Sequence, residues 1–164
     1  MHFALSLCNK RGLPFQIHTG IQEGLGSVLE NSNPAQLTNL FLEYPDVRFD
    51  IFHIGYPFQN ILCALAKQFP NVFIDMCWAH IISPNASALA LSEFIDTLAL
   101  NKVNAFGGDY CFVDGVYGHQ YLARQTVARV LAQKIDDGAM DMDTARFAAR
   151  RLLTDNPREL FGLD

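Results

Sequence analysis

Three residues that can bind a metal ion or move a proton follow short apolar stretches of this chain. They are His18, His53 and Asp109, and each stands at or just after the end of a segment that reads as a β-strand. Two imidazoles and one carboxylate suit a borderline divalent ion such as zinc. An ion held there would acidify a bound water and polarise a substrate carbonyl, and the aspartate could take the proton from that water. The residue types therefore predict a metal-dependent reaction.

A simpler role for the same residues is structural. His18 and His53 could bond backbone groups at the strand ends, and Asp109 could cap the segment that follows it. The three residues, however, follow the first, second and fourth predicted strands of a single array. This shared placement favours one common site over three separate structural roles.

The elements that must position these residues alternate regularly along the chain. Apolar strand-like runs recur at intervals typical of βαβ units, and stripes of apolar residues at helical spacing lie between them. We expect strands at 13–17, 47–52, 72–77 and 102–106, and helices at 2–10, 34–44, 62–69, 91–100, 123–138, 141–151 and from 156 onward. Right-handed crossovers would bring all strand C-termini to one edge, where α/β proteins place their chemistry.

Capping signals mark several of the predicted helices. Asn33 followed by Pro34 is a typical helix start, and Pro45 ends that helix. Asn156, with a proline next and a glutamate at position 159, resembles a capping box for a last short helix. The whole chain, residues 1–164, is expected to form one α/β domain of four parallel β-α units with further helices at the end.

Other polar and aromatic residues near the strand ends are weaker candidates. His80 could face the same pocket, but as a loop histidine we expect it at the surface. Asp75 lies inside an apolar strand, so we expect it to make a structural hydrogen bond. Cys111 is expected to pack as a small hydrophobe rather than to line a site. Three aromatic residues could shape a substrate pocket, with plain packing as the alternative: Tyr56, Trp78 and Tyr110.

Composition and charge narrow the class of protein. Half of the residues are hydrophobic, 18% are charged and the formal net charge is -5. An acidic chain has no electrostatic basis for holding phosphate backbones, so a nucleic-acid partner is not expected. No basic amphipathic face, long apolar run or signal peptide indicates a membrane or secretion. The four cysteines form no C-x-x-C pair, and we expect a cytoplasmic protein with reduced thiols that acts on a small molecule.

Four stretches resemble one superfamily, and they occur in the same order as in its members. They are Pro14–Gly20, His53–Gly55, Phe106–Asp109 and Asp155–Leu163. The chain is similar to the amidohydrolase superfamily, and within it to the "amidohydrolase 2" metal-dependent hydrolases of TIM-barrel fold, whose relatives include decarboxylases and uronate isomerases. The resemblance implies the second half of a (β/α)₈ barrel.

The resemblance also implies roles for the three residues. His18 matches a metal ligand that ends the fifth barrel strand. His53 matches a residue that binds a second metal or contacts the attacking water or the substrate, and Asp109 matches a residue that is both ligand and general base. The implied metal is zinc, with manganese or iron as alternatives. The resemblance assigns no substrate-binding residue.

One difference from the family bears directly on activity. The His-x-His pair that anchors the family's metal on the first barrel strand does not occur in this sequence. Four strands cannot close a barrel that needs eight. The chain would then be a fragment, or a half-barrel that self-associates through its open sheet edges.

Three functions remain open at this point. The first is a metal-dependent hydrolase acting on a C–N or C–O bond next to a carbonyl. The second is a metal-dependent decarboxylase or a uronate-type isomerase. The third is a non-catalytic half-barrel or truncated gene product.

Overall fold

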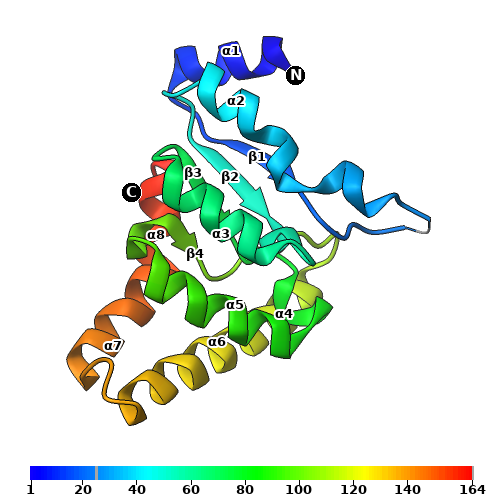
Figure 1. The fold of residues 1–164 in the computed structure, drawn as a ribbon. Helices are drawn as coiled ribbons and strands as arrows, with labels where there is room; N and C mark the ends of the chain where they lie inside the picture. Colours follow the sequence, from blue (N-terminus) through cyan, green and yellow to red (C-terminus); the bar gives the residue numbers. More distant parts are fainter. Residues whose placement is uncertain (25, 164) are drawn as a thin grey trace.

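Four parallel strands form one sheet. The computed structural model describes residues 1–24 and 26–163 of the chain. The strands are β1 (Phe15–His18), β2 (Phe49–Phe52), β3 (Val72–Asp75) and β4 (Val103–Asn104), and they lie in chain order across the sheet (Figure 1). Every neighbouring pair is parallel, with His18 opposite Phe52 and Asp75 opposite Asn104. The expected α/β class with a parallel sheet is confirmed.

Helices connect the strands and extend beyond the last one (Figure 1). None of the helices in the described part of the chain has the length and apolarity needed to cross a bilayer. The α-helices are α1 (His2–Arg11), α2 (Thr38–Glu43), α3 (Gln59–Gln68), α4 (Ala79–Ile82), α5 (Pro84–Thr97), α6 (Val113–Asp136), α7 (Met142–Arg150) and α8 (Asn156–Phe161). Shorter turns are η1 (Leu29–Ser32), η2 (Pro34–Leu37), η3 (His53–Gly55), η4 (Leu100–Lys102) and the π-helical η5 (Arg151–Asp155).

One helix is capped as the sequence predicts, and two others begin earlier than predicted. The side chain of Asn33 accepts a bond from the Ala35 N–H at 3.0 Å, as expected, although the first turn is 3₁₀ and the α-helix begins at Thr38. Helix α5 begins at Pro84, earlier than expected, because the Ser83 hydroxyl caps it. Helix α6 likewise begins well before residue 123, at Val113.

The expected capping box at the last helix is wrong. Asn156 does not cap α8, because the chain runs from α7 through η5 into α8 without a break. Its amide instead donates to the carbonyls of Leu100, at 2.7 Å, and Val103, at 2.8 Å. The asparagine therefore fastens the C-terminal helices to the start of β4.

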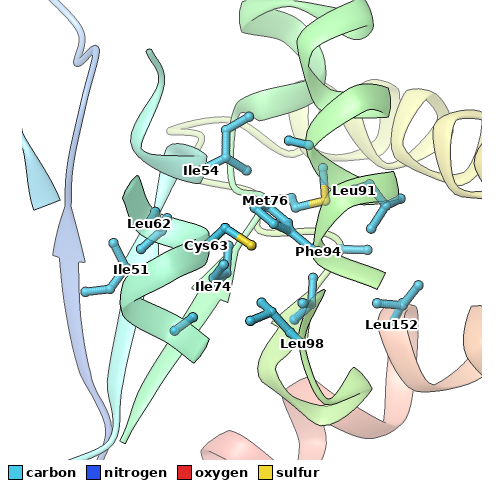
Figure 2. Close-up of a cluster of buried hydrophobic side chains, with 14 of the residues drawn as sticks. Ile51, Ile54, Leu62, Cys63, Ile74, Met76, Leu91, Phe94, Leu98 and Leu152 are labelled. Atoms are coloured by element: carbon cyan, nitrogen blue, oxygen red, sulfur yellow. The ribbon is translucent and has the colours of Figure 1, made fainter. Parts of the chain in front are cut away.

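The core lies between the sheet and the helices α3 and α5 (Figure 2). Ile51 and Ile74 of the sheet are fully buried and share one cluster with Leu62 of α3 and Phe94 of α5. Leu152 of η5 joins the same cluster. The strand positions are apolar on this face because it is covered by helices.

The two edge strands differ in what covers them. At the β4 edge, the Ala105 N–H donates to the Leu152 carbonyl at 2.9 Å, so the C-terminal helices occupy part of that edge. At the β1 edge, Gln16 and His18 are exposed. Among the described residues, no further strand pairs with β1.

Candidate metal centre

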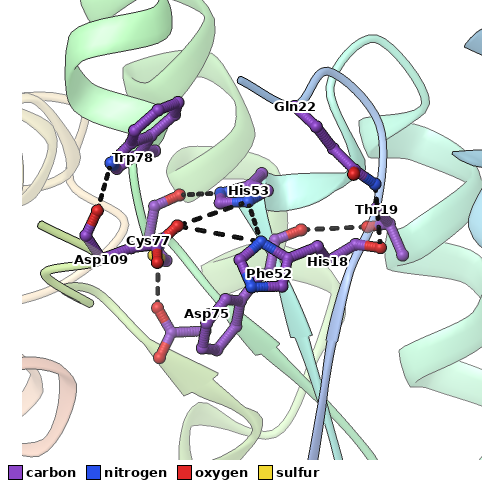
Figure 3. A network of polar contacts seen from close by, with 9 residues as sticks. All are labelled: His18, Thr19, Gln22, Phe52, His53, Asp75, Cys77, Trp78 and Asp109. Carbon is purple, nitrogen blue, oxygen red and sulfur yellow. Dashed lines mark hydrogen bonds and ion pairs between the residues drawn. The ribbon is translucent and has the colours of Figure 1, made fainter. Parts of the chain in front are cut away.

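The side chains of His18, His53 and Asp109 meet at one end of the sheet (Figure 3). His18 Nδ1 and His53 Nε2 lie 2.8 Å apart. Asp109 Oδ2 lies 3.8 Å from each of these two nitrogens. The structure therefore brings together all three residues that the sequence singled out.

His18 is held by the loop that follows β1. The Thr19 hydroxyl donates to the Phe52 carbonyl at 2.9 Å, which fastens the end of β1 to the end of β2. Gly20 has φ 68°, and a Cβ there would overlap the Tyr56 carbonyl. Only glycine fits such a left-handed position against a neighbouring backbone. This explains the glycine directly after the His18-Thr19 pair.

His53 is buried, and its protonation state follows from its contacts. Its Nδ1 lies 3.0 Å from the Cys77 carbonyl, which can only accept, so Nδ1 carries the proton. Burial lowers the pKa of His53, an effect opposed by its hydrogen bond to Cys77. The ring is therefore neutral at pH 7, and its Nε2 carries a lone pair that can accept from His18 Nδ1 or bind a metal ion.

Asp109 lies further from its strand than expected. Strand β4 ends at Asn104, and an irregular segment carries the chain on to Asp109. A Cβ on Gly107 would stand 2.5 Å from Asp75 Oδ1, so only glycine allows this segment to pass so close to β3. The Trp78 indole N–H donates to the main-chain carbonyl of Asp109 at 2.9 Å.

Left-handed backbone conformations gather at this site. In the described residues, the non-glycine positions with positive φ are His53, Ile54, Trp78 and Asp109. Such conformations cost on the order of 1 kcal/mol each and occur preferentially at functional sites. Two of these residues belong to the site and a third, Trp78, is bonded to it, so the strain is concentrated where the three side chains meet.

The three candidate ligand atoms suit a divalent ion in their chemistry and in their spacing. A tetrahedral zinc ion keeps two ligand atoms ~3.3 Å apart, given bond lengths of ~2.0–2.1 Å. The separations here are 2.8 Å and 3.8 Å, so shifts of about half an ångström would suffice. The neutral His53, with its second nitrogen bonded to a carbonyl, is in the usual state of a metal-binding imidazole. These residues could hold such an ion.

A hollow of ≈ 540 Å³ opens over the three residues. Aromatic side chains and the polar residues of the loop after β1 form its wall, and no lysine or arginine lines its described part. The lining residues are His18, Gln22, Glu23, His53, Trp78, Asp109, Tyr110, Cys111 and Val116.

Some of the weaker candidates lie where expected and others do not. Trp78 and Tyr110 line the hollow, whereas Tyr56 lines a separate one between α3 and α5. Asp75 makes the structural hydrogen bond expected of it, since its Oδ1 accepts from the Cys77 N–H at 2.7 Å. The expectation for Cys111 is wrong: its side chain is exposed and lines the hollow, because the segment after Asp109 runs over the surface.

The expectation of a surface position for His80 is also wrong. Helix α4 turns His80 inward, and it is fully buried with Nε2 2.8 Å from the Ala105 carbonyl. Its ring packs 5.5 Å from that of His119, which is also buried and has no hydrogen-bond partner for either ring nitrogen in the described part of the chain. Burial lowers the pKa of His119 to about 4, so both rings are neutral parts of the core.

The contacts of Cys77 and Trp78 with the site were missed by the sequence reasoning. Both residues follow β3, which supplies none of the three candidate ligands. A tryptophan directly after a strand was a signal for a pocket wall. Nothing in the sequence marked its bond to Asp109.

Parallel β-α units with such a group at their strand ends occur in (β/α)₈ barrels and in open α/β sheets alike. The chain matches the Amidohydrolase family (Amidohydro_2) over residues 1–163 and belongs to that family. The predicted family is thereby confirmed, and the superpositions on longer solved chains confirm the partial-barrel fold.

One curated relative matches the chain in sequence, and solved structures match it in fold. The chain is 26% identical over 152 residues to Protein fluG of Emericella nidulans, covering 92% of this chain and 18% of that protein. It superposes on a protein of Lactobacillus casei described as a metal-dependent hydrolase, with a TM-score of 0.82, 16% identity and coverage of 98% of this chain and 42% of the other. A uronate isomerase of Bacillus halodurans gives a TM-score of 0.80 at 18% identity, with 98% and 41% covered. The chain thus spans less than half the length of each of these proteins.

Proposed function

We propose that this chain carries part of the active site of a divalent-metal-dependent hydrolase that cleaves a C–N or C–O bond next to a carbonyl. The observation that carries the proposal is the meeting of His18 Nδ1, His53 Nε2 and Asp109 Oδ2 at one point of an amidohydrolase fold. Zinc suits this donor set, and manganese or iron are alternatives.

The three side chains would divide the work by their surroundings. A divalent ion bound there supplies an acidified water and polarises a carbonyl. Asp109, about a third exposed at 34%, is open to the hollow and would accept a proton from the nucleophile and return it to the leaving group. The buried His53 is kept neutral and fixed in orientation by Cys77, which suits a ligand or a group that orients the substrate.

The wall of the hollow bears on the substrate. Aromatic rings and uncharged or acidic groups line its described part. Such a wall accepts a small neutral or donor-bearing molecule more readily than an anion, since Glu23 would repel an anion and, in the described lining, only a bound divalent ion would offset that repulsion. This agrees with an amide or ester substrate.

A second candidate is a metal-dependent isomerase or decarboxylase, and the superposition on uronate isomerases favours it. The uronate isomerase of Thermotoga maritima also superposes, with a TM-score of 0.76 at 15% identity. A sugar acid would need a cation for its carboxylate. No lysine or arginine lines the described part of the hollow, so the divalent ion alone would have to serve both this carboxylate and the reacting oxygens, which is why we place hydrolysis first.

Turnover by the purified protein tests the proposal. The protein is loaded with zinc, manganese or iron and assayed against amides, esters and lactones, and in parallel against sugar acids and aromatic acids. We expect metal-dependent hydrolysis that falls at least ~100-fold in Asp109→Asn, because the base is lost. Asp143→Asn is the matched control, since its carboxylate is almost fully exposed on α7, and it should leave the rate unchanged.

Other results would favour a different function for this chain. Turnover of a sugar acid or release of CO₂ would favour the isomerase or the decarboxylase. A protein that binds no metal and turns over none of these compounds would overturn the proposal and favour a non-catalytic half-barrel.

A further inference from the structure

The end of β3 contacts two of the three site residues without offering a ligand to the group. Cys77 accepts a hydrogen bond from His53 Nδ1, and Trp78 donates one to the main chain of Asp109 (Figure 3). The Cys77 thiol is not among the clustered ligand atoms, which come from His18, His53 and Asp109, and burial raises its pKa. The two adjacent residues act through groups that bind no metal: a carbonyl and an indole N–H.

Asp109 needs such support because its own backbone does not fix it. The residue has φ 50°, and the segment that carries it lies outside regular secondary structure. A left-handed aspartate is strained and is kept only where its surroundings impose it. The hydrogen bond from Trp78 to the Asp109 carbonyl, 2.9 Å long, orients the peptide that carries the side chain.

The indole itself is well placed to hold this position. Trp78 has φ 59°, and its ring lies 5.8 Å from that of His53 and 6.4 Å from that of Tyr110. The ring is thus held between the buried histidine and the pocket wall, with its N–H directed at the segment after β4. A phenylalanine in its place would keep most of the packing and lose the donor.

We infer that Trp78 is a positioning residue, whose indole N–H sets the main chain of Asp109 so that the carboxylate faces His18 and His53. The role of Trp78 in metal binding rests on the proposed function, whereas its hold on the segment of residues 107–111, through the indole N–H, does not. Trp78 therefore raises metal affinity through Asp109 rather than by touching the ion.

Metal titration of two matched variants tests the first part. Trp78→Phe removes the donor, and Tyr117→Phe removes a hydroxyl from an exposed ring of α6 that does not line the hollow. Calorimetric titration with zinc should show binding weakened roughly 3- to 10-fold in Trp78→Phe, the usual effect of one lost hydrogen bond, and unchanged binding in Tyr117→Phe. Equal affinities for Trp78→Phe and the unchanged protein would overturn the inference.

A second measurement without metal separates this inference from the proposed function. Trp78 is the single tryptophan of the chain, so its indole N–H gives one resolved signal in an NMR spectrum. We expect that proton to exchange slowly with solvent, and the amides of residues 107–111 to exchange faster in Trp78→Phe. A freely exchanging indole proton overturns the inference. A protected proton in a protein that binds no zinc supports the hold on the segment while the proposed function fails.

Discussion

Replacing Asp50 by asparagine should change how the stability of the protein depends on pH. Asp50 lies in the middle of β2 with no exposed surface. Gln16 donates to Oδ2 at 3.1 Å and Asn104 to Oδ1 at 3.5 Å. Burial raises the pKa of Asp50 to about 6, an effect that these two bonds oppose without cancelling.

The magnitude and the sign follow from the two pKa values. An ordinary carboxyl has a pKa of 3.8, so holding the proton until about pH 6 corresponds to about 3 kcal/mol. Below pH 3.8 Asp50 is protonated in both the folded and unfolded states, and its contribution to stability is fully present. Between the two values the unfolded chain ionises first, so that contribution is lost as the pH rises through about 6.

Urea unfolding of the metal-free protein from pH 4 to pH 8 measures the effect. Asparagine has the same shape, and the exposed Gln16 can rotate its amide to accept from it. The free energy of unfolding of Asp50→Asn relative to the unchanged protein should rise by up to about 3 kcal/mol across this range. Asp143→Asn, on the exposed face of α7, should show no such trend. A difference between Asp50→Asn and the unchanged protein that stays constant with pH would refute the reasoning.

Three further outcomes are expected. Gly20→Ala should lower the free energy of unfolding by well over 1 kcal/mol, because the added Cβ would meet the Tyr56 carbonyl. Gly12 is also left-handed but has open space around it, so Gly12→Ala should lower the free energy of unfolding by only about 1 kcal/mol. Equal losses for the two variants in urea unfolding would contradict the packing argument. Asn156→Ala should lower the free energy of unfolding by about 1–3 kcal/mol, measured by thermal unfolding, because two carbonyls lose their donor. Asn101→Ala, at an exposed position, should leave it nearly unchanged. A similar loss for both variants would be evidence against the bridge from α8 to β4. We also expect self-association through the β1 edge. Sedimentation at micromolar concentration should then show a species heavier than the 18.3 kDa chain. A monomer at every concentration would count against this expectation.

The fold was largely predictable from the sequence because its signals are local. Apolar runs separated by helical stripes indicate βαβ units, and parallel strands share one edge for their C-termini. This is why the sequence alone predicts that His18, His53 and Asp109 lie together. To predict that these side chains meet, it was enough to know that each residue follows a strand. The exact backbone path was not needed.

The surroundings of the site were not predictable because they depend on long-range backbone geometry. His80 stands in a stretch that reads as a loop, and only the short helix α4 buries it beneath Ala105. Asn156 has the sequence neighbours of a cap, yet its amide reaches back to β4. The bond from Trp78 to Asp109 depends on two left-handed residues, which a helix-or-strand pattern does not encode.

Binding of one divalent ion by His18, His53 and Asp109 is the central claim, and the fluorescence of Trp78 tests it most directly. This single tryptophan lies 5.8 Å from the His53 ring, so an ion at the site should alter its emission. Titration of tag-free protein with zinc should give a saturable change at about one ion per chain, absent in His18→Ala and retained in the exposed control His2→Ala. No saturable change, or the same change in His18→Ala, would contradict the claim.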